Sequence, residues 1–409
     1  MKIYNKIQGL LLIAALVCGC NKSSIPEGPD DNEITIELDK SYIQFNSGIE
    51  TKGTLVDGYL NSSFAVLGYQ YPGQWEGEHV FAEPNVFKTE NSGDWAVPQI
   101  VTYDDATQLY TYNPVQAWTG NRYSFFAYYP HDNANIKLFD DGTVKLGVPY
   151  ITYTHPTDGD PTKLVDVMTA SFIDTKIGYD ENGNEINYEV NLEMQHRMSA
   201  IDICARNYYK DETGIPLTIE ITSLEFNPIV PYKSAKFYLD GTTEVIPLAA
   251  GETGNLTYSL VKEGVSNVAT SWMLSTIDII KNDSEDTDLR YITSSKSVKD
   301  DDGNITSYPT TILLIPHPLS PVQQDLKQIP LTGTLVLSYR MKYDDGTYVM
   351  NGDKPAIKTV NQDLSVYNRV LMEARRYYIE ITFTSDAVTV NLTAADEWDL
   401  PDKVEMEFE

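Results

Sequence analysis

The side chains that most often perform acid–base, nucleophilic or metal chemistry are few in this chain and lie far apart. Its 409 residues contain five histidines and three cysteines, and no two histidines have the spacing of a metal-ligand pair. The chain also lacks the Gly-x-Ser-x-Gly turn of hydrolases, the His-Glu-x-x-His of zinc proteases and the Gly-Lys-Ser/Thr of phosphate-binding loops. We therefore expect no catalytic residue, no metal site, no cofactor and no enzymatic activity.

The individual candidates for catalysis have simpler structural interpretations. His196 opens a segment, residues 196–203, that alternates like a strand, so a packed or edge histidine is expected there. Cys204 ends that segment and is expected to be a small buried hydrophobic residue. His131 and His155 stand beside turn residues and are expected to be solvated.

Carboxylates are too numerous for a catalytic pair to be chosen among them. There are 59 Asp and Glu residues, so close pairs arise by chance. Residues 180–185 and 300–304 are acidic and contain glycine, which suggests calcium loops. A helix-loop-helix calcium site needs Gly at its sixth and Glu at its twelfth position, and from Asp180 these are Glu185 and Asn191. Both segments are therefore predicted to be hairpin turns, with incidental calcium binding as the alternative.

Cys20 is the cysteine with the clearest chemical context. It follows a basic start with Lys2 and Lys6, a short apolar run over residues 10–17, and the small Gly19. Such a run is too short for a membrane span and is typical of a secretory signal. A cysteine directly after a small residue resembles the lipobox of bacterial lipoproteins, whose cysteine becomes the lipidated N-terminus. We predict a signal peptide over residues 1–19 and lipidation at Cys20; the alternative is an ordinary signal peptide with a chance cysteine.

The charge of the chain excludes several classes of partner. The formal net charge is −29, and it becomes −31 without residues 1–19, because Lys2 and Lys6 leave and no acid does. Nucleic-acid binding and adhesion to anionic membranes both need basic patches, so neither is expected. Cys204 alone remains as a free thiol, so no intrachain disulfide can form and the apolar core must hold the fold.

Two-residue alternation and tight-turn pairs predict strands almost throughout the chain after a flexible tether over residues 20–33. Asp-Gly occurs at residues 141, 240, 302 and 345, and Asn-Gly at residue 182; these pairs tolerate the positive φ of tight hairpins. The predicted strands include residues 64–69, 123–129, 199–204, 217–226, 333–339 and 377–383. Residues 369–376 are the one place where a short helical turn is expected.

This pattern predicts an all-β protein with two sandwich domains. The polar, turn-forming stretch 206–216 favours a boundary near residue 210, which gives an N-terminal β-sandwich over residues 34–210 and a C-terminal β-sandwich over residues 211–409. The 28 tyrosines, with pairs such as Tyr128-Tyr129 and Tyr377-Tyr378, have two interpretations. They are either strand formers or platforms that stack on carbohydrate.

Several segments together resemble the fimbrillins, the pilus and cell-adhesion proteins of Bacteroides-type bacteria. The resemblance extends over nearly the whole chain, and no single segment carries it alone. The matching segments are residues 51–54, 64–69, Trp118 with 123–130, 194–203, 311–316, and 376–383 through Trp398.

The resemblance implies two transthyretin-like β-sandwich domains in tandem and export as a lipoprotein of the outer membrane or cell surface. It also implies that other fimbrial subunits are partners through donor-strand exchange. In that mechanism a trypsin-like protease removes the first strand, and a strand from another subunit fills the vacated groove. Residues 34–45 are the candidate removable strand, and the bond between Lys52 and Gly53 is the candidate cleavage site.

One departure from the family pattern leaves the role open. The family's protease is usually arginine-directed, yet the first arginine here is Arg122, directly before a predicted strand. Lysine does not replace arginine in a pocket built for a guanidinium group. Either Lys52 is cleaved, or the chain stays anchored through Cys20 as a basal, accessory or tip subunit. The alternative function is a lipid-anchored surface protein that binds glycans and does not polymerise.

Overall fold

The computed structural model is almost entirely β-structure, which confirms the all-β prediction. It describes the following residues: 43–46, 62–71, 86–87, 98–104, 109–118, 122–139, 148–175, 178–179, 185–186, 189–264, 273–280, 289–293, 298–299, 305–306, 311–318 and 328–395. Within these ranges, none of the elements is a helix of the length and apolar character that crossing a bilayer requires.

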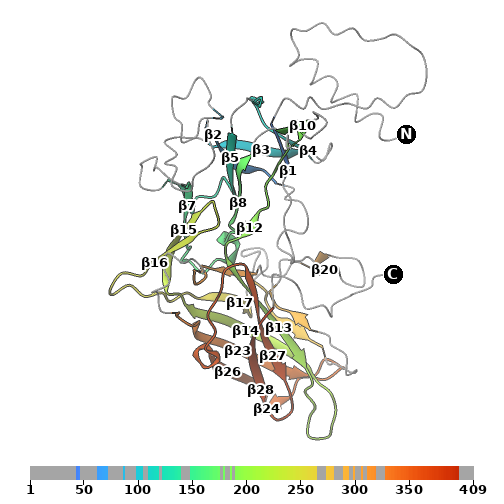
Figure 1. Cartoon of the computed structure of the whole chain (residues 1–409). Coiled ribbons are helices and arrows are strands. Elements are labelled where there is room, and N and C mark those ends of the chain that lie inside the picture. The colour runs from blue at the N-terminus through green and yellow to red at the C-terminus, as the bar shows by residue number, and fades with distance from the viewer. Residues whose placement is uncertain are drawn as a thin grey trace, which may run out of the picture.

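One half of the molecule is built around a six-stranded antiparallel sheet (Figure 1). Its strand order is β12 (Gln195–His196), β8 (Met168–Thr175), β5 (Arg122–Tyr129), β2 (Phe64–Tyr71), β3 (Gln99–Asp104) and β4 (Leu109–Thr111). The unbroken apolar runs of β2 and β5 follow from burial on both faces of this sheet. Phe125 faces one apolar cluster of the core, and its neighbour Phe126 faces the other.

The other half is a sandwich of two five-stranded sheets. The first contains β19 (Arg290–Tyr291), β13 (Ser199–Asn207), β27 (Arg375–Phe383) and β28 (Val388–Ala394), with β22 (Ile312–Leu314) also paired to β13. The second contains β17 (Tyr258–Lys262), β14 (Thr218–Ile229), β23 (Thr332–Lys342) and β26 (Ile357–Asp363), with β18 (Ile277–Ile279) also paired to β14. Tyr339 and Phe383 join the two sheets edge to face, with ring centroids 5.0 Å apart.

A four-stranded sheet lies between these halves in Figure 1. Its order is β16 (Thr243–Pro247), β15 (Tyr232–Tyr238), β7 (Tyr150–Thr154) and β6 (Ile136–Leu138). Here β7 pairs with β15, while in the sandwich β13 pairs in parallel with β27 over nine residues. Ladders thus join strands from both sides of residue 210, and the division into two tandem domains at that residue remains a prediction.

Short two-stranded ladders confirm several predicted hairpins. β9 (Gly178–Tyr179) pairs with β10 (Glu185–Ile186), and β20 (Val298–Lys299) pairs with β21 (Ile305–Thr306), on either side of the two acidic segments. A further short ladder, not among the predicted hairpins, joins β24 (Met350–Asn351) to β25 (Lys354–Pro355). At the β15–β16 turn, Gly241 has a φ of +99°, the conformation that its Asp-Gly sequence favours.

The helical turn expected over residues 369–376 is wrong. The two short 3-10 helices described are η1 (Pro161–Lys163) and η3 (Leu364–Tyr367). η3 forms because Asp363 accepts a hydrogen bond from the Ser365 amide at 2.8 Å, and because Leu364 is buried beneath it. Residues 375–383 instead continue as strand β27, since β13 and β28 flank them.

Candidate functional site

The N-terminal strand β1 (Gln44–Asn46) is the part of the predicted removable segment that the structure describes. It pairs in parallel with β11 (Glu189–Asn191), so that Phe45 stands opposite Val190. Just before β1, the Ile43 amide donates a hydrogen bond to the Gln116 carbonyl at 2.9 Å. The strand therefore lies between β11 on one side and the segment after β4 on the other. Its described ladder covers only three residue pairs.

The side chains of this short strand are buried as deeply as those of the central strands. Ile43 is 1% exposed and Phe45 is 4% exposed. The Phe45 ring contacts Phe87, Tyr112 and Phe125, with centroids 6.0, 5.3 and 5.5 Å away. Edge-to-face pairs of this kind stabilise by about 0.5–1.5 kcal/mol each beyond the area that they bury. We call this group of four rings the Phe45 cluster.

Gly68 on β2 makes room for the Phe45 cluster. A Cβ atom at this position would come within 2.6 Å of the Phe87 ring and within 2.8 Å of the Val86 Cβ, closer than real Cβ contacts. Gly68 also accepts a backbone hydrogen bond from Val86 at 3.2 Å. A glycine inside an apolar strand often marks such a close approach. The sequence carried this signal, but it did not identify Phe87 or Tyr112 as the partners of the strand.

Tyr112 contacts β1 in two ways: its ring packs on Phe45, and its hydroxyl bonds to the backbone beside the strand. Its hydroxyl donates a hydrogen bond to the Ile43 carbonyl at 2.9 Å and accepts one from the Gln116 amide at 3.2 Å. Burial raises the pKa of Tyr112 to about 12, although the hydrogen bond from Gln116 opposes that rise. The phenol therefore stays protonated at neutral pH and remains available as a donor.

We call the site that β1 occupies the seat of β1. It is formed by β11, the segment around Tyr112 and Gln116, and the rings of Phe87 and Phe125, and it combines apolar surface with hydrogen-bonding groups on both sides. Burying side chains the size of Ile43 and Phe45 stabilises a fold by about 1.5–3 kcal/mol each, or about 3–6 kcal/mol together. If β1 left, the edge of β11 and the Gln116 carbonyl would lose their partners, and the Tyr112 hydroxyl would lose its acceptor. Exposed strand edges and apolar pockets of this kind bind another extended strand.

Most of the residues predicted to control the release of this strand are not among those that the structure describes. Cys20, Lys52, Gly53 and residues 34–42 all fall outside it, so lipidation and cleavage remain predictions. Arg122 is described, and it is the first residue of β5 in the middle of the six-stranded sheet. Cleavage at Arg122 would break the chain at the start of a central strand of that sheet.

The aromatic residues proposed as platforms for carbohydrate are mostly inside the protein. Trp118 packs edge to face on Tyr123, with centroids 4.8 Å apart, and belongs to the partly buried border of the core. Tyr69, Tyr128, Tyr377 and Tyr378 are each at most 6% exposed. These tyrosines therefore act as strand formers in the core, and they offer no free ring face to a sugar.

The histidine and cysteine candidates have structural roles. His196 lies on edge strand β12, and its Nδ1 is 2.8 Å from Asp166 Oδ2. Cys204 is buried, and burial raises the pKa of its thiol, so it is an unreactive core residue as expected. The expectation that His155 is solvated is wrong. It is 5% exposed and shares a 3.0 Å hydrogen bond with the Tyr258 hydroxyl, because residues 155–159 pack against the start of β17.

Two buried ion pairs lie near the beginnings of strands β13 and β27 in the sandwich half. Asp202 on β13 lies 3.5 Å from Arg376 on β27 and accepts a 2.6 Å hydrogen bond from Thr311. Arg197 lies 2.8 Å from Glu373. Burial raises the pKa values of Asp202 and Glu373, and the neighbouring arginines oppose that rise. In the described ranges, no three His, Cys, Asp or Glu side chains are grouped so that they could bind a metal ion.

These sheets, ladders and buried aromatic strands define an all-β sandwich protein in which a short N-terminal strand completes one core. Comparison with solved structures assigns the fold more closely. A fimbrial protein from Bacteroides vulgatus matches with a TM-score of 0.57 and 16% identity, over 87% of this chain and 99% of that one. The resemblance to fimbrillins is therefore confirmed at the level of the fold.

Two other solved structures match with less similarity in the arrangement of their strands. A proposed cell adhesion protein from Bacteroides uniformis matches at 11% identity and a TM-score of 0.42, over 88% of this chain and all of that one. The fimbrial anchor protein Mfa2 from Porphyromonas gingivalis matches at 10% identity and a TM-score of 0.34, over 87% and 97%. The fold assignment rests on the first structure. No protein-family model and no curated protein sequence matches the chain.

Proposed function

We propose that this chain is a non-enzymatic fimbrial subunit or fimbrillin-type adhesin of the cell surface, which assembles with other subunits by strand exchange. The observation that carries the proposal is the seat of β1. Phe45 is buried in a four-ring cluster, yet in the described residues its strand is joined to the body by a parallel ladder of only three residue pairs. The fold shared with the Bacteroides vulgatus fimbrial protein supports the same class of function.

In this proposal the chain is exported with lipid on Cys20 and is then cut after Lys52. The segment that contains β1 leaves, and a strand from another subunit takes its place over the Phe45 groove. The physical basis is that a donated strand restores both the backbone hydrogen bonds and the apolar side-chain contacts that departure of β1 removes. If Lys52 is not cut, the same chain remains on the membrane as an anchor or accessory subunit.

The experiment is limited digestion of the lipid-free protein with a trypsin-like protease, followed by electrophoresis in SDS. We expect a cut after Lys52 and then a ladder of SDS-resistant oligomers. The Lys52→Gln variant should give neither product. Lys40→Gln is the matched control, because Lys40 lies in the same N-terminal segment but before Ile43, and this variant should still be cut and form ladders. A cut without a ladder, or no cut at all, would exclude the polymerising subunit and leave the anchored adhesin.

The glycan-binding alternative has less support. Tyr69, Tyr128, Tyr377 and Tyr378 are buried and Trp118 packs on Tyr123, whereas Tyr208 is 38% exposed. Specific affinity of the uncut, full-length protein in a glycan-binding assay would restore that function.

A further inference from the structure

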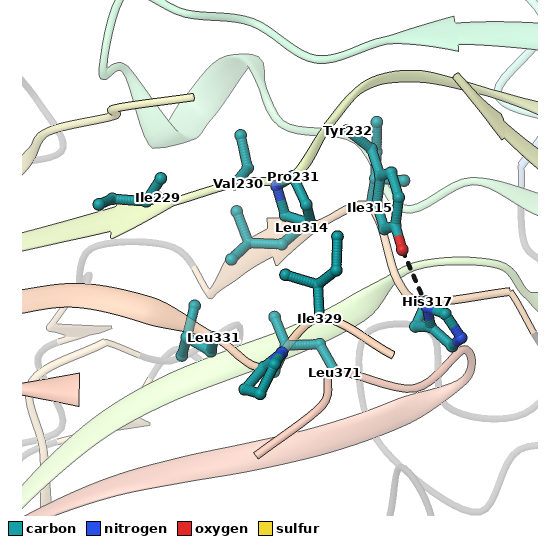
Figure 2. A pocket seen from close by; sticks show the side chains of 11 residues that line it. Ile229, Val230, Pro231, Tyr232, Leu314, Ile315, His317, Ile329, Leu331 and Leu371 are labelled. Atoms are coloured by element: carbon teal, nitrogen blue, oxygen red, sulfur yellow. Dashed lines mark hydrogen bonds between the residues drawn. The ribbon is translucent and has the colours of Figure 1, made fainter. Parts of the chain in front are cut away.

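An apolar pocket in the sandwich half is too small for a partner's side chain (Figure 2). Its walls are apolar apart from Tyr232 and His317, which a 2.8 Å hydrogen bond joins at one end. The cavity is about 20 Å³, which is room for about one water molecule. The seat of β1, in contrast, already encloses the side chains of Ile43 and Phe45.

The ring of Phe45 lies among three other rings, Phe87, Tyr112 and Phe125, which we call the cage. Phe87 contacts both of the other rings of the cage, with centroids 5.6 Å from Tyr112 and 6.2 Å from Phe125. Phe45 is 4% exposed, so the cage is filled. Protein interiors are packed as closely as organic crystals, and a side chain that is too small or too large for its site is destabilising. The cage therefore discriminates by the size and shape of the side chain that enters it.

Gly68 fixes the position of Phe87 in the cage. It stands opposite Phe125 in the ladder between β2 and β5, and its carbonyl accepts the 3.2 Å hydrogen bond from Val86, the residue before Phe87. The Phe87 ring comes within 2.6 Å of the place that a Cβ atom of residue 68 would take, an approach that only glycine permits. Any larger residue would displace Phe87 and change the shape of the cage.

The backbone contacts fix where along a strand the enclosed ring must lie. The Gln116 carbonyl accepts a hydrogen bond from the Ile43 amide, and the Tyr112 hydroxyl donates one to the Ile43 carbonyl, both at 2.9 Å. Phe45 comes two residues later and stands opposite Val190 in the parallel ladder. Residues two apart in a strand point to the same face. The seat of β1 thus fits an extended strand, parallel to β11, with an aliphatic residue that has a free N–H and an aromatic residue two places later.

We propose that Gly68 and Phe87 determine the specificity of the seat of β1, by shaping a cage that selects a strand with a phenylalanine-sized ring two places after an aliphatic residue. The inference rests on the proposed strand exchange for its partner, which is such a strand from another subunit. The selection itself is a property of the cage and acts equally on the chain's own β1. The two proposals can therefore be tested apart.

The first test uses the full-length chain, in which Phe45 already occupies the cage, and does not require strand exchange. Phe45→Leu should lower the urea midpoint of unfolding in the parent protein. In the Gly68→Ala background the same change should have a clearly smaller effect, because the displaced Phe87 no longer fits a ring. Phe226→Leu is the matched control, since Phe226 is fully buried in the sandwich half and its effect should be the same in both backgrounds. Additive effects of Phe45→Leu and Gly68→Ala would overturn the proposal.

Phe87→Leu gives the same answer if the Gly68→Ala protein does not fold. It removes one ring of the cage and leaves β2 unchanged, so it should also reduce the effect of Phe45→Leu on the urea midpoint. Phe226→Leu should again be additive. Additivity between Phe45→Leu and Phe87→Leu would overturn the proposal.

The second test measures the selection of an added strand by the protein cut after Lys52. A labelled peptide of residues 34–46 should bind the parent protein about tenfold more tightly than its Phe45→Leu version, a difference of about 1.4 kcal/mol. In the Gly68→Ala or Phe87→Leu protein this preference should be lost. If the two residues only support the fold, both peptides bind more weakly and the ratio of their affinities stays unchanged, which would overturn the proposal.

A third peptide tests the register of the bound strand. Its Ile43→Pro change removes the N–H that donates to the Gln116 carbonyl, so it should bind weakly to the parent and to the variants alike. Binding as tight as that of the unchanged peptide would contradict the register. If no peptide binds the cut protein while Phe45 and Gly68 remain coupled in the full-length chain, strand exchange is disproved and selection by the cage stands.

Discussion

Phe45 and Phe125 meet edge to face in the core, with ring centroids 5.5 Å apart and ring planes at 86°. Phe125 belongs to β5, a central strand of the six-stranded sheet, whereas Phe45 belongs to a strand whose described ladder has three residue pairs. A strand with a short described ladder thus contributes a deeply buried ring. Side-chain burial, more than backbone pairing, holds β1 in place, and this is the property that an exchangeable strand needs.

Replacing Phe45 by alanine tests how much this contact stabilises the fold. A buried Phe→Ala change leaves a cavity and typically costs about 3–5 kcal/mol, so Phe45→Ala should lower the free energy of unfolding by about that amount in urea titration. Ile357→Ala is the control, because Ile357 is 59% exposed and should change stability by at most about 0.5 kcal/mol. Equal effects of the two variants would show that the Phe45 cluster is not part of the stabilising core.

Removing the Tyr112 hydroxyl tests the backbone attachment separately. Tyr112→Phe keeps the ring beside Phe45 and deletes the hydrogen bonds with Ile43 and Gln116. The expected loss is about 1–2 kcal/mol, measured as faster amide hydrogen exchange at residues 43–46. Exchange in β13 serves as the internal control and should not change. Unaltered exchange at β1 would mean that Tyr112 does not fasten the strand.

His155 should make the protein less stable in mild acid. Burial lowers the pKa of His155 to about 4, against 6.5 for the unperturbed group. Between these values the unfolded chain binds the proton first, so stability is lost as the pH falls from about 6.5 to about 4. At 1.36 kcal/mol per pKa unit the full loss is about 3 kcal/mol.

The His155→Gln variant isolates this effect because glutamine can still bond to Tyr258 but does not titrate. The difference in unfolding free energy between parent and variant should shrink or reverse as the pH falls through this range. Parallel stability curves for the two proteins from pH 7 to pH 4 would contradict the assignment. Carboxylates that titrate in the same range contribute equally to both proteins and cancel in the comparison.

The ion pair between Asp202 and Arg376 should be costly to break. Asp202→Asn leaves the Arg376 guanidinium, which is 2% exposed, without its counter-charge, and loss of a buried partner typically costs about 3–5 kcal/mol. The control is Glu252→Gln, which breaks the exposed pair with Lys233 and should have a much smaller effect, because exposed ion pairs are screened by solvent. Thermal unfolding measures both variants, and similar shifts in Tm would show that burial does not matter at Asp202.

The strands were predictable from the sequence because their signals are local. The segments around Phe64, Tyr123, Ser199, Thr332 and Tyr377 combine β-branched and aromatic residues with turn pairs, and all of them are strands. Their partners were not predictable. The parallel pairing of β13 with β27, and the ladder from β7 to β15, join residues far apart in the chain through contacts that have no short-range sequence signal.

For the candidate site, too, the strand could be predicted from the sequence but its contacts could not. The resemblance to fimbrillins gave residues 34–45 as the candidate removable strand, and the described strand β1 begins at Gln44 within that segment. Tyr112 and Phe87 were missed, because their roles depend on which loops close over β1. His155 was misjudged because neighbouring turn residues suggested solvent, whereas its burial comes from the approach of β17.

The most direct measurement of strand exchange uses the protein after cleavage at Lys52 and a synthetic peptide of residues 34–46. Our account predicts that the labelled peptide binds the cleaved protein, raises its Tm and, in excess, prevents SDS-resistant ladders. A peptide with Phe45→Asp should do none of these, because a carboxylate cannot be buried among Phe87, Tyr112 and Phe125. Equal activity of the two peptides, or ladders that persist in excess wild-type peptide, would contradict exchange at the seat of β1.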